Sequence, residues 1–279
     1  MKELIYKVHE YRIKQVWRRF EDAGFKPVLI KGWWAAQFYT EPSERRFNDI
    51  DLIINPDEYD KAVELAKKFE VIMGVDLHCG ARHLDSLDFK TLFAKSKIVK
   101  CGDTSIRVLC PEDHLRVLCV HWLIDGGANR ERLRDIFYAV ENRPADFDWE
   151  RCLDVCGETR KRWIICTLGL ANKYLGLNLE DTPLAGTKIE IPEWLIKSLE
   201  KEWANDVKIV PLHYCLNDWT KFKQQIKKRI PPNPIQATVE MEGKFDNRTR
   251  VFYQTGDFFY RLVPSLKRVK GVLLSKFKK

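Results

Sequence analysis

Two acidic residues near the N-terminus have a spacing suited to metal binding. Asp49 and Asp51 are separated by one residue and run into the apolar stretch 52–54, which predicts a strand. Alternate residues of a strand point to the same face, so the two carboxylates lie side by side. Such a pair repels itself unless a divalent cation lies between its members, and hard oxygen ligands suit Mg²⁺ or Mn²⁺. We therefore predict a metal site at Asp49 and Asp51.

A third carboxylate follows further along the chain. Asp76 lies at the end of another apolar run and would complete the same site. His78 follows Asp76 by two positions and so shares its strand face, near the metal. A catalytic role and a structural role are both open for His78.

A turn before the acidic pair has features of a phosphate-binding turn. A predicted strand over 28–31 ends at Lys31-Gly32, and the apolar stretch 33–39 predicts a helix. Glycine lets backbone approach a ligand closely, and a helix N-terminus offers free N–H groups to phosphate. The Lys31 ammonium is a point-charge partner for a triphosphate. Arg45 is a candidate for binding triphosphate or steadying a carboxylate, with a solvated loop charge as the alternative.

The order of phosphate turn, acidic pair and third acid resembles the DNA polymerase β-like nucleotidyltransferase superfamily. Within it, the chain is most similar to a bacterial uncharacterised nucleotidyltransferase family with Lys-Gly, Arg, Asp-x-Asp and Asp-x-His in this order. The corresponding residues here are Lys31, Gly32, Arg45, Asp49, Asp51, Asp76 and His78. The similarity continues through 108–115, His121 and 133–136, and covers roughly residues 25–180. One departure is Gly32-Trp33, where most of the superfamily has Gly-Ser or Gly-Gly.

The resemblance implies a Mg²⁺- or Mn²⁺-dependent enzyme that moves a nucleoside monophosphate from an NTP to a hydroxyl or phosphate acceptor and releases pyrophosphate. The catalytic and metal-binding residues would be Asp49, Asp51 and Asp76. The nucleotide-binding positions would be Lys31, Gly32, Trp33, Arg45 and His78. The aromatic side chains Trp33, Trp34, Phe38 and Tyr39 are predicted as the buried face of a helix rather than a base-stacking platform.

Two other functions are open. Asp-x-Asp also occurs in metal-dependent glycosyltransferases that use nucleotide-sugars, but these begin with a dinucleotide-fold-like segment, which the Lys31-Gly32 turn does not resemble. The other is a nucleotidyltransferase fold used only for binding, as a regulatory or partner protein. The presence of all three acids argues against it.

The pattern of apolar residues predicts an α+β protein whose N-terminal part is α/β. Residues 1–110 would form the nucleotidyltransferase-like domain with a mixed sheet, 111–180 a helical domain lining the cleft, and 181–279 a helical or irregular extension. The predicted strands are 28–31, 49–54, 71–78, and a hairpin of 96–100 with 105–109 turning at Gly102-Asp103. The predicted helices are 3–23, 57–69, 112–124, 130–141, 148–157 and 160–175.

Composition indicates a globular protein. The chain has 279 residues, 45% of them hydrophobic, enough for one large core or two moderate ones. No apolar run approaches the roughly 20 residues of a membrane span, and the charged start does not resemble a signal peptide. The expected location is the cytoplasm, where the eight cysteines would be reduced.

Two basic clusters dominate the net charge of +8. One is Lys221, Lys223, Lys227, Lys228 and Arg229, and the other is the tail 261–279, which has no acid. The tail suits an anionic membrane surface or a nucleic acid, and a solvated end is the simpler alternative. We hypothesise that it recruits the enzyme to a polyanionic or membrane-associated acceptor, at the membrane periphery. No nucleic-acid-binding module is recognisable, and nucleic acid stays open as a partner.

Overall fold

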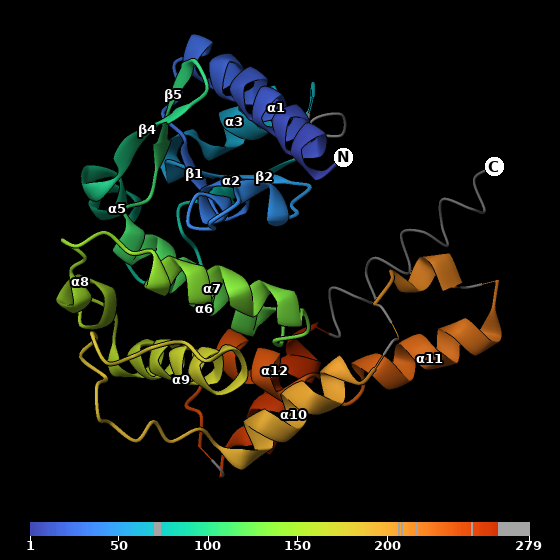
Figure 1. The fold of residues 1–279 in the computed structure, drawn as a ribbon. Coiled ribbons are helices and arrows are strands. Elements are labelled where there is room, and N and C mark those ends of the chain that lie inside the picture. The colour runs from blue at the N-terminus through green and yellow to red at the C-terminus, as the bar shows by residue number, and fades with distance from the viewer. Residues whose placement is uncertain (70–73, 206, 208, 216, 247, 262–279) are drawn as a thin grey trace. The chain divides into compact units, whose positions relative to one another are not determined.

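The computed structural model describes residues 1–69, 74–205, 207, 209–215, 217–246 and 248–261 (Figure 1). They form two compact units. The first consists of Met1–His121 and Glu131–Ile189, and the second of Trp122–Arg130 and the described residues from Glu190 onward. The predicted division into 1–110, 111–180 and 181–279 stays a prediction.

A five-stranded mixed sheet forms the centre of the first unit. Its strands lie in the order β3-β2-β1-β5-β4. Their bounds are β1 (Val28–Ile30), β2 (Ile50–Ile54), β3 (Val75–Cys79), β4 (Lys97–Cys101) and β5 (Thr104–Val108). Strands β1 and β5, and β2 and β3, pair in parallel, whereas β1 and β2, and β4 and β5, are antiparallel. The mixed sheet and its accompanying helices confirm the predicted α+β class.

The strand sequences explain the sheet. All residues of β1 and β2 are buried, which is why these central strands read as nearly continuous apolar runs. The hairpin of β4 and β5 turns at Gly102, whose φ of 60° suits glycine, and this confirms the predicted hairpin. The predicted strand 71–78 is described only from Gly74, and β3 within it runs to Cys79.

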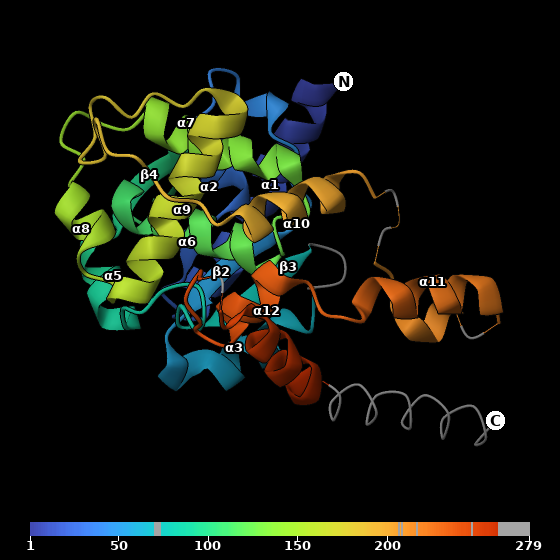
Figure 2. The same cartoon turned by 90° about the horizontal axis from the view of Figure 1, so that it is seen from below.

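Eight α-helices are described that begin in the first unit. They are α1 (Lys2–Asp22), α2 (Gly32–Ala36), α3 (Tyr59–Ala66), α5 (Phe89–Lys95), α6 (Pro111–Ile124), α7 (Leu133–Glu141), α8 (Trp149–Leu153) and α9 (Glu158–Leu175). Short 3₁₀ turns precede several strands and helices: η1 (Pro42–Glu44), η2 (Pro56–Glu58) and η3 (Arg130–Arg132). Figure 2 shows the same elements from below.

Several boundaries differ from the predictions. The helix expected over 33–39 is the single turn α2, and the one expected over 148–157 ends at Leu153. Helix α5 was not predicted, although it has a recognisable start. The side chain of Asp88 accepts a hydrogen bond from the Thr91 N–H at 2.8 Å, as an N-cap residue does.

The second unit is helical. Its helices are α10 (Glu193–Trp203), α11 (Trp219–Arg229), α12 (Pro234–Glu240) and the helical residues 250–261, with a 3₁₀ turn η4 (Leu212–Cys215). Helices α10 and α12 contact each other through a small apolar core. The buried side chains of these two helices include Trp194, Leu195, Leu199, Ile235 and Val239.

Among the described residues, none of the helices combines the length and the apolar character needed to cross a bilayer. The hypothesis about the basic tail concerns residues 262–279, which lie outside the described part of the chain.

The sheet and the following helices of the first unit share one interior. The Tyr39 hydroxyl donates to Asp135 Oδ1 of α7 at 2.7 Å, and the Asn142 amide donates to the Phe38 carbonyl at 2.6 Å. We therefore expect limited proteolysis not to release 1–110 as a stable fragment, because its removal would expose these groups. Size-exclusion chromatography and mass spectrometry of a timed digest would check this. A monomeric, folded 1–110 product would contradict it.

The imidazole of His114 in α6 is fully buried. Its ring lies 6.0 Å from that of Phe38 and 5.8 Å from that of Trp34, centroid to centroid. Neither ring nitrogen has a hydrogen-bond partner among the described residues. Burial, together with the charge of Arg45, lowers the pKa of His114 to about 3. The imidazole is therefore neutral in the folded protein at neutral pH.

We expect His114 to make the protein sensitive to acid. The unfolded chain takes up a proton at His114 near pH 6.5 and the folded protein only near pH 3. As the pH is lowered through this window, the free energy of unfolding should therefore decrease, by up to about 1.4 kcal/mol per pH unit from this group. Urea unfolding at pH 7, 6, 5 and 4 would measure it. In His114→Leu the slope should be smaller by this amount, and equal slopes would contradict the assignment.

Candidate active site

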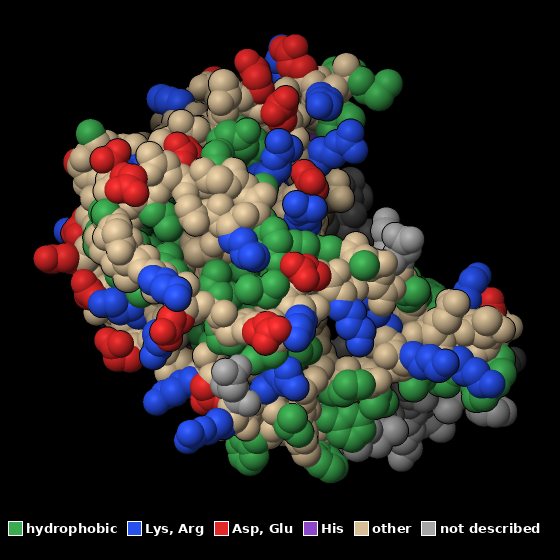
Figure 3. Space-filling model, turned by 60° about the horizontal axis from the view of Figure 1, so that its bottom comes forward, with side chains coloured by type: hydrophobic (Ala, Val, Ile, Leu, Met, Phe, Trp, Pro, Cys, Tyr) green, Lys and Arg blue, Asp and Glu red, His purple; other side chains and the backbone are tan. Residues whose placement is uncertain are grey.

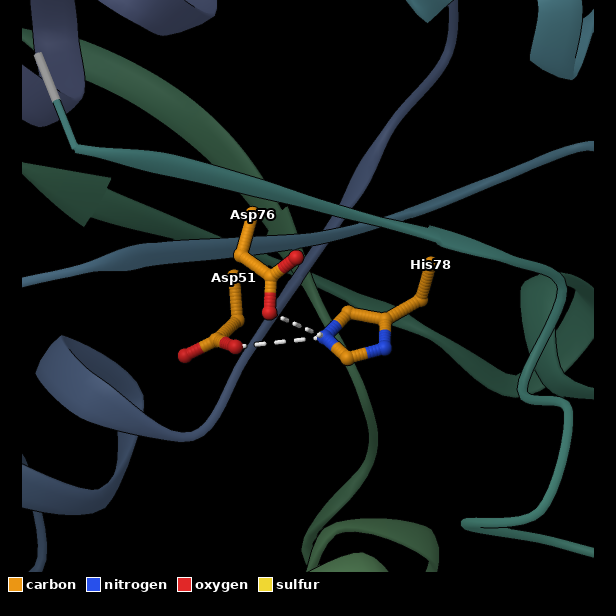
Figure 4. A group of neighbouring side chains, drawn as sticks. All are labelled: Asp51, Asp76 and His78. Carbon is orange, nitrogen blue, oxygen red and sulfur yellow. Dashed lines mark hydrogen bonds and ion pairs between the residues drawn. The ribbon is translucent and has the colours of Figure 1, made fainter. Parts of the chain in front are cut away.

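Strands β2 and β3 bring two predicted carboxylates together. In the parallel register of these strands Asp51 is paired with Asp76, so both side chains lie on one face of the sheet. His78, two residues after Asp76, lies on the same face (Figure 4). Asp51 is buried, His78 is partly covered, and the Asp76 side chain is 60% exposed. The group therefore opens to solvent on the side of Asp76.

The three side chains converge closely enough to share a cation. His78 Nε2 lies 3.1 Å from Asp51 Oδ1 and 3.6 Å from Asp76 Oδ2. One potential ligand atom of each residue lies within 4.8 Å of the others. Within the part of the chain that the structure describes, no other three His, Cys, Asp or Glu side chains meet this spacing. The predicted proximity of Asp76 and His78 is confirmed.

Lys31 lies directly beside this group. Its Nζ is 2.6 Å from Asp51 Oδ1 and 3.5 Å from His78 Nε2, and the Lys31 side chain is buried. Burial alone would raise the pKa of Asp51, but the interactions with His78 and Lys31 outweigh it and lower that pKa to about 2. Asp51 is therefore a carboxylate over the whole physiological pH range.

The backbone of the Lys31-Gly32 turn has positive φ angles, which accounts for the glycine at position 32. Lys31 has φ 53° and Gly32 has φ 27°, both in the region that favours glycine. A Cβ atom at Gly32 would lie 3.4 Å from the Asp49 carbonyl oxygen. The turn is thus held against the backbone that precedes β2, and Lys31 reaches Asp51 from there.

Asp49 is the predicted metal ligand that lies outside the group. It is exposed and precedes β2, which begins at Ile50. Its Oδ1 accepts a hydrogen bond from the Asn48 N–H at 3.3 Å. The structure therefore brings together Asp51, Asp76 and His78, and leaves Asp49 outside this group, just before the start of β2.

Arg45 has a partner that sequence spacing did not indicate. Its Nε lies 2.9 Å from Asp135 Oδ1 and its Nη2 lies 2.7 Å from Asp135 Oδ2, a two-pronged ion pair in which both side chains are 4% exposed. Arg45 is therefore not a solvated loop charge. It steadies a carboxylate, as one of its predicted roles requires, but that carboxylate belongs to α7.

The two tryptophans after the turn are core residues. Trp33 donates its indole N–H to Glu10 Oε1, and Trp34 donates to the Leu109 carbonyl, both at 3.1 Å. Both are buried in α2, as predicted. Phe38 and Tyr39 are buried as well, but they follow α2 and are not part of its helical face. A nucleotide contact at position 33 would therefore involve the backbone of Trp33 rather than its ring.

Two further histidines, His121 and His83, lie near enough to Lys31 for its charge to affect their pKa values. Burial, together with the charges of Lys31 and Arg132, lowers the pKa of His121 to about 3. Burial and the nearby cationic groups, among them Lys31 and Arg160, also lower the pKa of His83. His121 lies within the family resemblance, whereas no motif marks His83. Both imidazoles therefore favour the neutral form, and one of the cations that lower their pKa values is Lys31, which also lies beside Asp51.

The donor set fits a divalent cation. Asp51 and Asp76 offer oxygen, the ligand type that suits Mg²⁺ and Mn²⁺, and His78 offers a nitrogen, which suits transition metals. Asp49 would add a third carboxylate and so favour a hard cation such as Mg²⁺ further.

Comparison with known proteins adds one finding. Residues 7–70 match the sequence model of a family described as an uncharacterised nucleotidyltransferase. The match includes Lys31, Gly32, Arg45, Asp49 and Asp51, and it ends before Asp76 and His78. No curated protein and no solved structure matches the chain. Over this stretch the similarity favours nucleotidyl transfer as the general chemistry.

Proposed function

We propose that the protein is a divalent-metal-dependent nucleotidyltransferase with a polymerase β-like catalytic domain. It moves a nucleoside monophosphate from an NTP to a hydroxyl or phosphate acceptor and releases pyrophosphate. The observation that carries this proposal is the convergence of Asp51, Asp76 and His78 beside Lys31, next to a stretch similar to nucleotidyltransferases.

Asp51 and Asp76 hold the cation, Mg²⁺ or Mn²⁺, and Asp49, which lies just before β2, completes the ligand set. When bound, the cation neutralises phosphate charge and lowers the pKa of an attacking hydroxyl. His78 adds an imidazole ligand or orients Asp51, to which it lies close.

Basic residues bind the triphosphate. The Lys31 ammonium forms an ion pair with the Asp51 carboxylate and can also donate to a phosphate oxygen bound beside that carboxylate. Gly32 allows the backbone to approach the phosphates, in place of the hydroxyl that this turn lacks. Asp76 is the most exposed member of the group, which suits it to favour deprotonation of an incoming acceptor hydroxyl.

The sheet topology bears on the alternative functions. A glycosyltransferase with a dinucleotide-fold-like start would place parallel strands first, whereas β1 and β2 are antiparallel. A protein that only binds nucleotide would have the same residues in its site, so only a measurement of nucleotidyl transfer can distinguish that alternative from an enzyme.

The test is incubation of the protein with each α-phosphate-labelled NTP, Mg²⁺ or Mn²⁺, and cell extract. Label should pass to one class of molecule, pyrophosphate should be released, and EDTA should stop both. The labelled molecule then identifies the acceptor. Nucleotide binding without label transfer or pyrophosphate release, with any NTP and either metal, would favour the binding-only alternative.

A further inference from the structure

Helix α11 in the second unit carries five cations and no acid between Trp219 and Arg229. The structure divides these cations into two sets. Lys228 faces inward and lies 2.6 Å from Glu202 Oε1 of α10. Arg229 also faces inward and donates to Gln225 Oε1 and to the Val210 carbonyl, each at 2.6 Å. These two cations attach the helix to its own unit.

A ridge on the opposite side of α11 is formed by Trp219, Lys223 and Lys227, which are spaced four residues apart. All three are exposed, and the Trp219 side chain lies on the surface with the residue 67% exposed. Phe222 lies parallel to the Trp219 indole, with ring centroids 5.5 Å apart and an angle of 10°. Figure 3 shows Lys and Arg side chains gathered over this helix.

The exposed Trp219 indole is informative because of the cations next to it on the same helix and not because of its exposure alone, since single exposed apolar side chains are common. Lys223 Nζ lies over the Trp219 ring, 5.3 Å from its centre, in a cation–π contact, so a cation is held at the stacking surface itself. Lys227 follows one turn later, about 6 Å further along the helix axis. An aromatic ring followed along the helix by two ammonium groups is an arrangement in which a nucleic-acid base can stack on the ring while backbone phosphates pair with the ammonium groups.

We infer that the ridge of Trp219, Lys223 and Lys227 binds single-stranded nucleic acid, with a base stacked on the indole and phosphates paired with the two ammonium groups. The polarity of the other exposed positions of α11 distinguishes a nucleic acid from an anionic membrane as the partner. They are polar: Thr220, Lys221 and Gln224. A helix that lies in a membrane surface needs a broad apolar face, and α11 exposes none. The inference does not depend on the proposed transfer reaction.

The test uses the full-length protein and fluorescein-labelled oligouridine of about 20 nucleotides, long enough for one binding site. Fluorescence anisotropy gives the affinity without NTP or metal, so the result is separate from any transfer activity. We expect Trp219→Ala to weaken binding by about 5- to 100-fold, because stacking contributes that much per base. Lys223→Gln with Lys227→Gln should reduce the dependence of log affinity on log salt by about 1.4, from two lost phosphate contacts.

A matched control is available on α10. Lys197→Gln with Lys201→Gln removes the same charge at the same spacing, beside Trp194, which is buried. Its affinity and salt dependence should stay close to those of the wild type. Circular dichroism would show that all variants are folded, as expected for exposed positions.

Two results would overturn the inference. One is oligonucleotide binding that is the same in the wild type and in both α11 variants. A wild type that does not bind the oligonucleotide at all would count as this result. The other is binding to phosphatidylserine vesicles that Trp219→Ala abolishes while oligonucleotide binding stays the same. The second result would assign the ridge to a lipid surface.

Discussion

Asp51→Asn is expected to lower nucleotidyl transfer by at least about 10³-fold, the scale of losing a principal charge-stabilising group. Asp51 is the buried member of the acidic group and lies close to both His78 and Lys31. An amide there carries no charge and is a much weaker ligand for a hard cation. Release of pyrophosphate, measured with Mg²⁺ and with Mn²⁺, would check the loss.

The same substitution should also weaken the fold, and this must be separated from chemistry. It leaves the buried Lys31 ammonium without its carboxylate, at a cost of about 3–5 kcal/mol. Asp51→Asn combined with Lys31→Met removes both charges and should recover most of that stability without recovering activity. Thermal unfolding of the single and double variants would show the difference.

Asp49→Asn gives a cleaner comparison, because Asp49 is exposed and lies in no buried pair. It should abolish transfer with little change in stability, whereas the exposed control Asp60→Asn in α3 should change neither. Wild-type activity in Asp51→Asn would remove the metal assignment altogether. Wild-type activity in Asp49→Asn alone would leave Asp51, Asp76 and His78 as the complete ligand set.

Asp135→Ala is expected to lower the free energy of unfolding by about 3–5 kcal/mol, because it leaves the guanidinium of Arg45 buried and unpaired. Asp135 also accepts a hydrogen bond from Tyr39, so two partners lose their acceptor at once. Urea unfolding monitored by tryptophan fluorescence would measure the loss. Arg134→Ala is the control, because the 3.5 Å pair of Arg134 with Glu131 is exposed and contributes at most about 1 kcal/mol.

A double variant decides what Arg45 does. Arg45→Met with Asp135→Leu replaces the buried pair by apolar groups and should recover most of the stability. If it also retains transfer and NTP affinity, Arg45 is a structural residue. If it is stable but binds NTP poorly, Arg45 contacts the triphosphate as the family resemblance implies. A loss below 1 kcal/mol in Asp135→Ala would contradict the importance of the pair for the fold.

Local signals in the sequence determined much of the first unit. The apolar runs of β1 and β2 and the turn at Gly102 were recognisable because burial and backbone conformation act on neighbouring residues. The side-by-side placement of Asp76 and His78 followed from strand alternation alone. The core character of Trp33 was likewise predictable from its apolar surroundings.

Only the tertiary structure decided which side chains meet across the chain. The register of β2 with β3 pairs Asp51 with Asp76, whereas Asp49 lies just before the start of β2. The partner of Arg45 lies 90 residues further on, at a distance for which no local pattern exists. The two sides of α11 can likewise be distinguished only in the tertiary structure, because Lys228 pairs with Glu202 of α10 whereas Lys223 lies on the surface. Charge and periodicity are properties of short segments, whereas pairing depends on how segments distant in sequence pack, and packing is decided by the whole core.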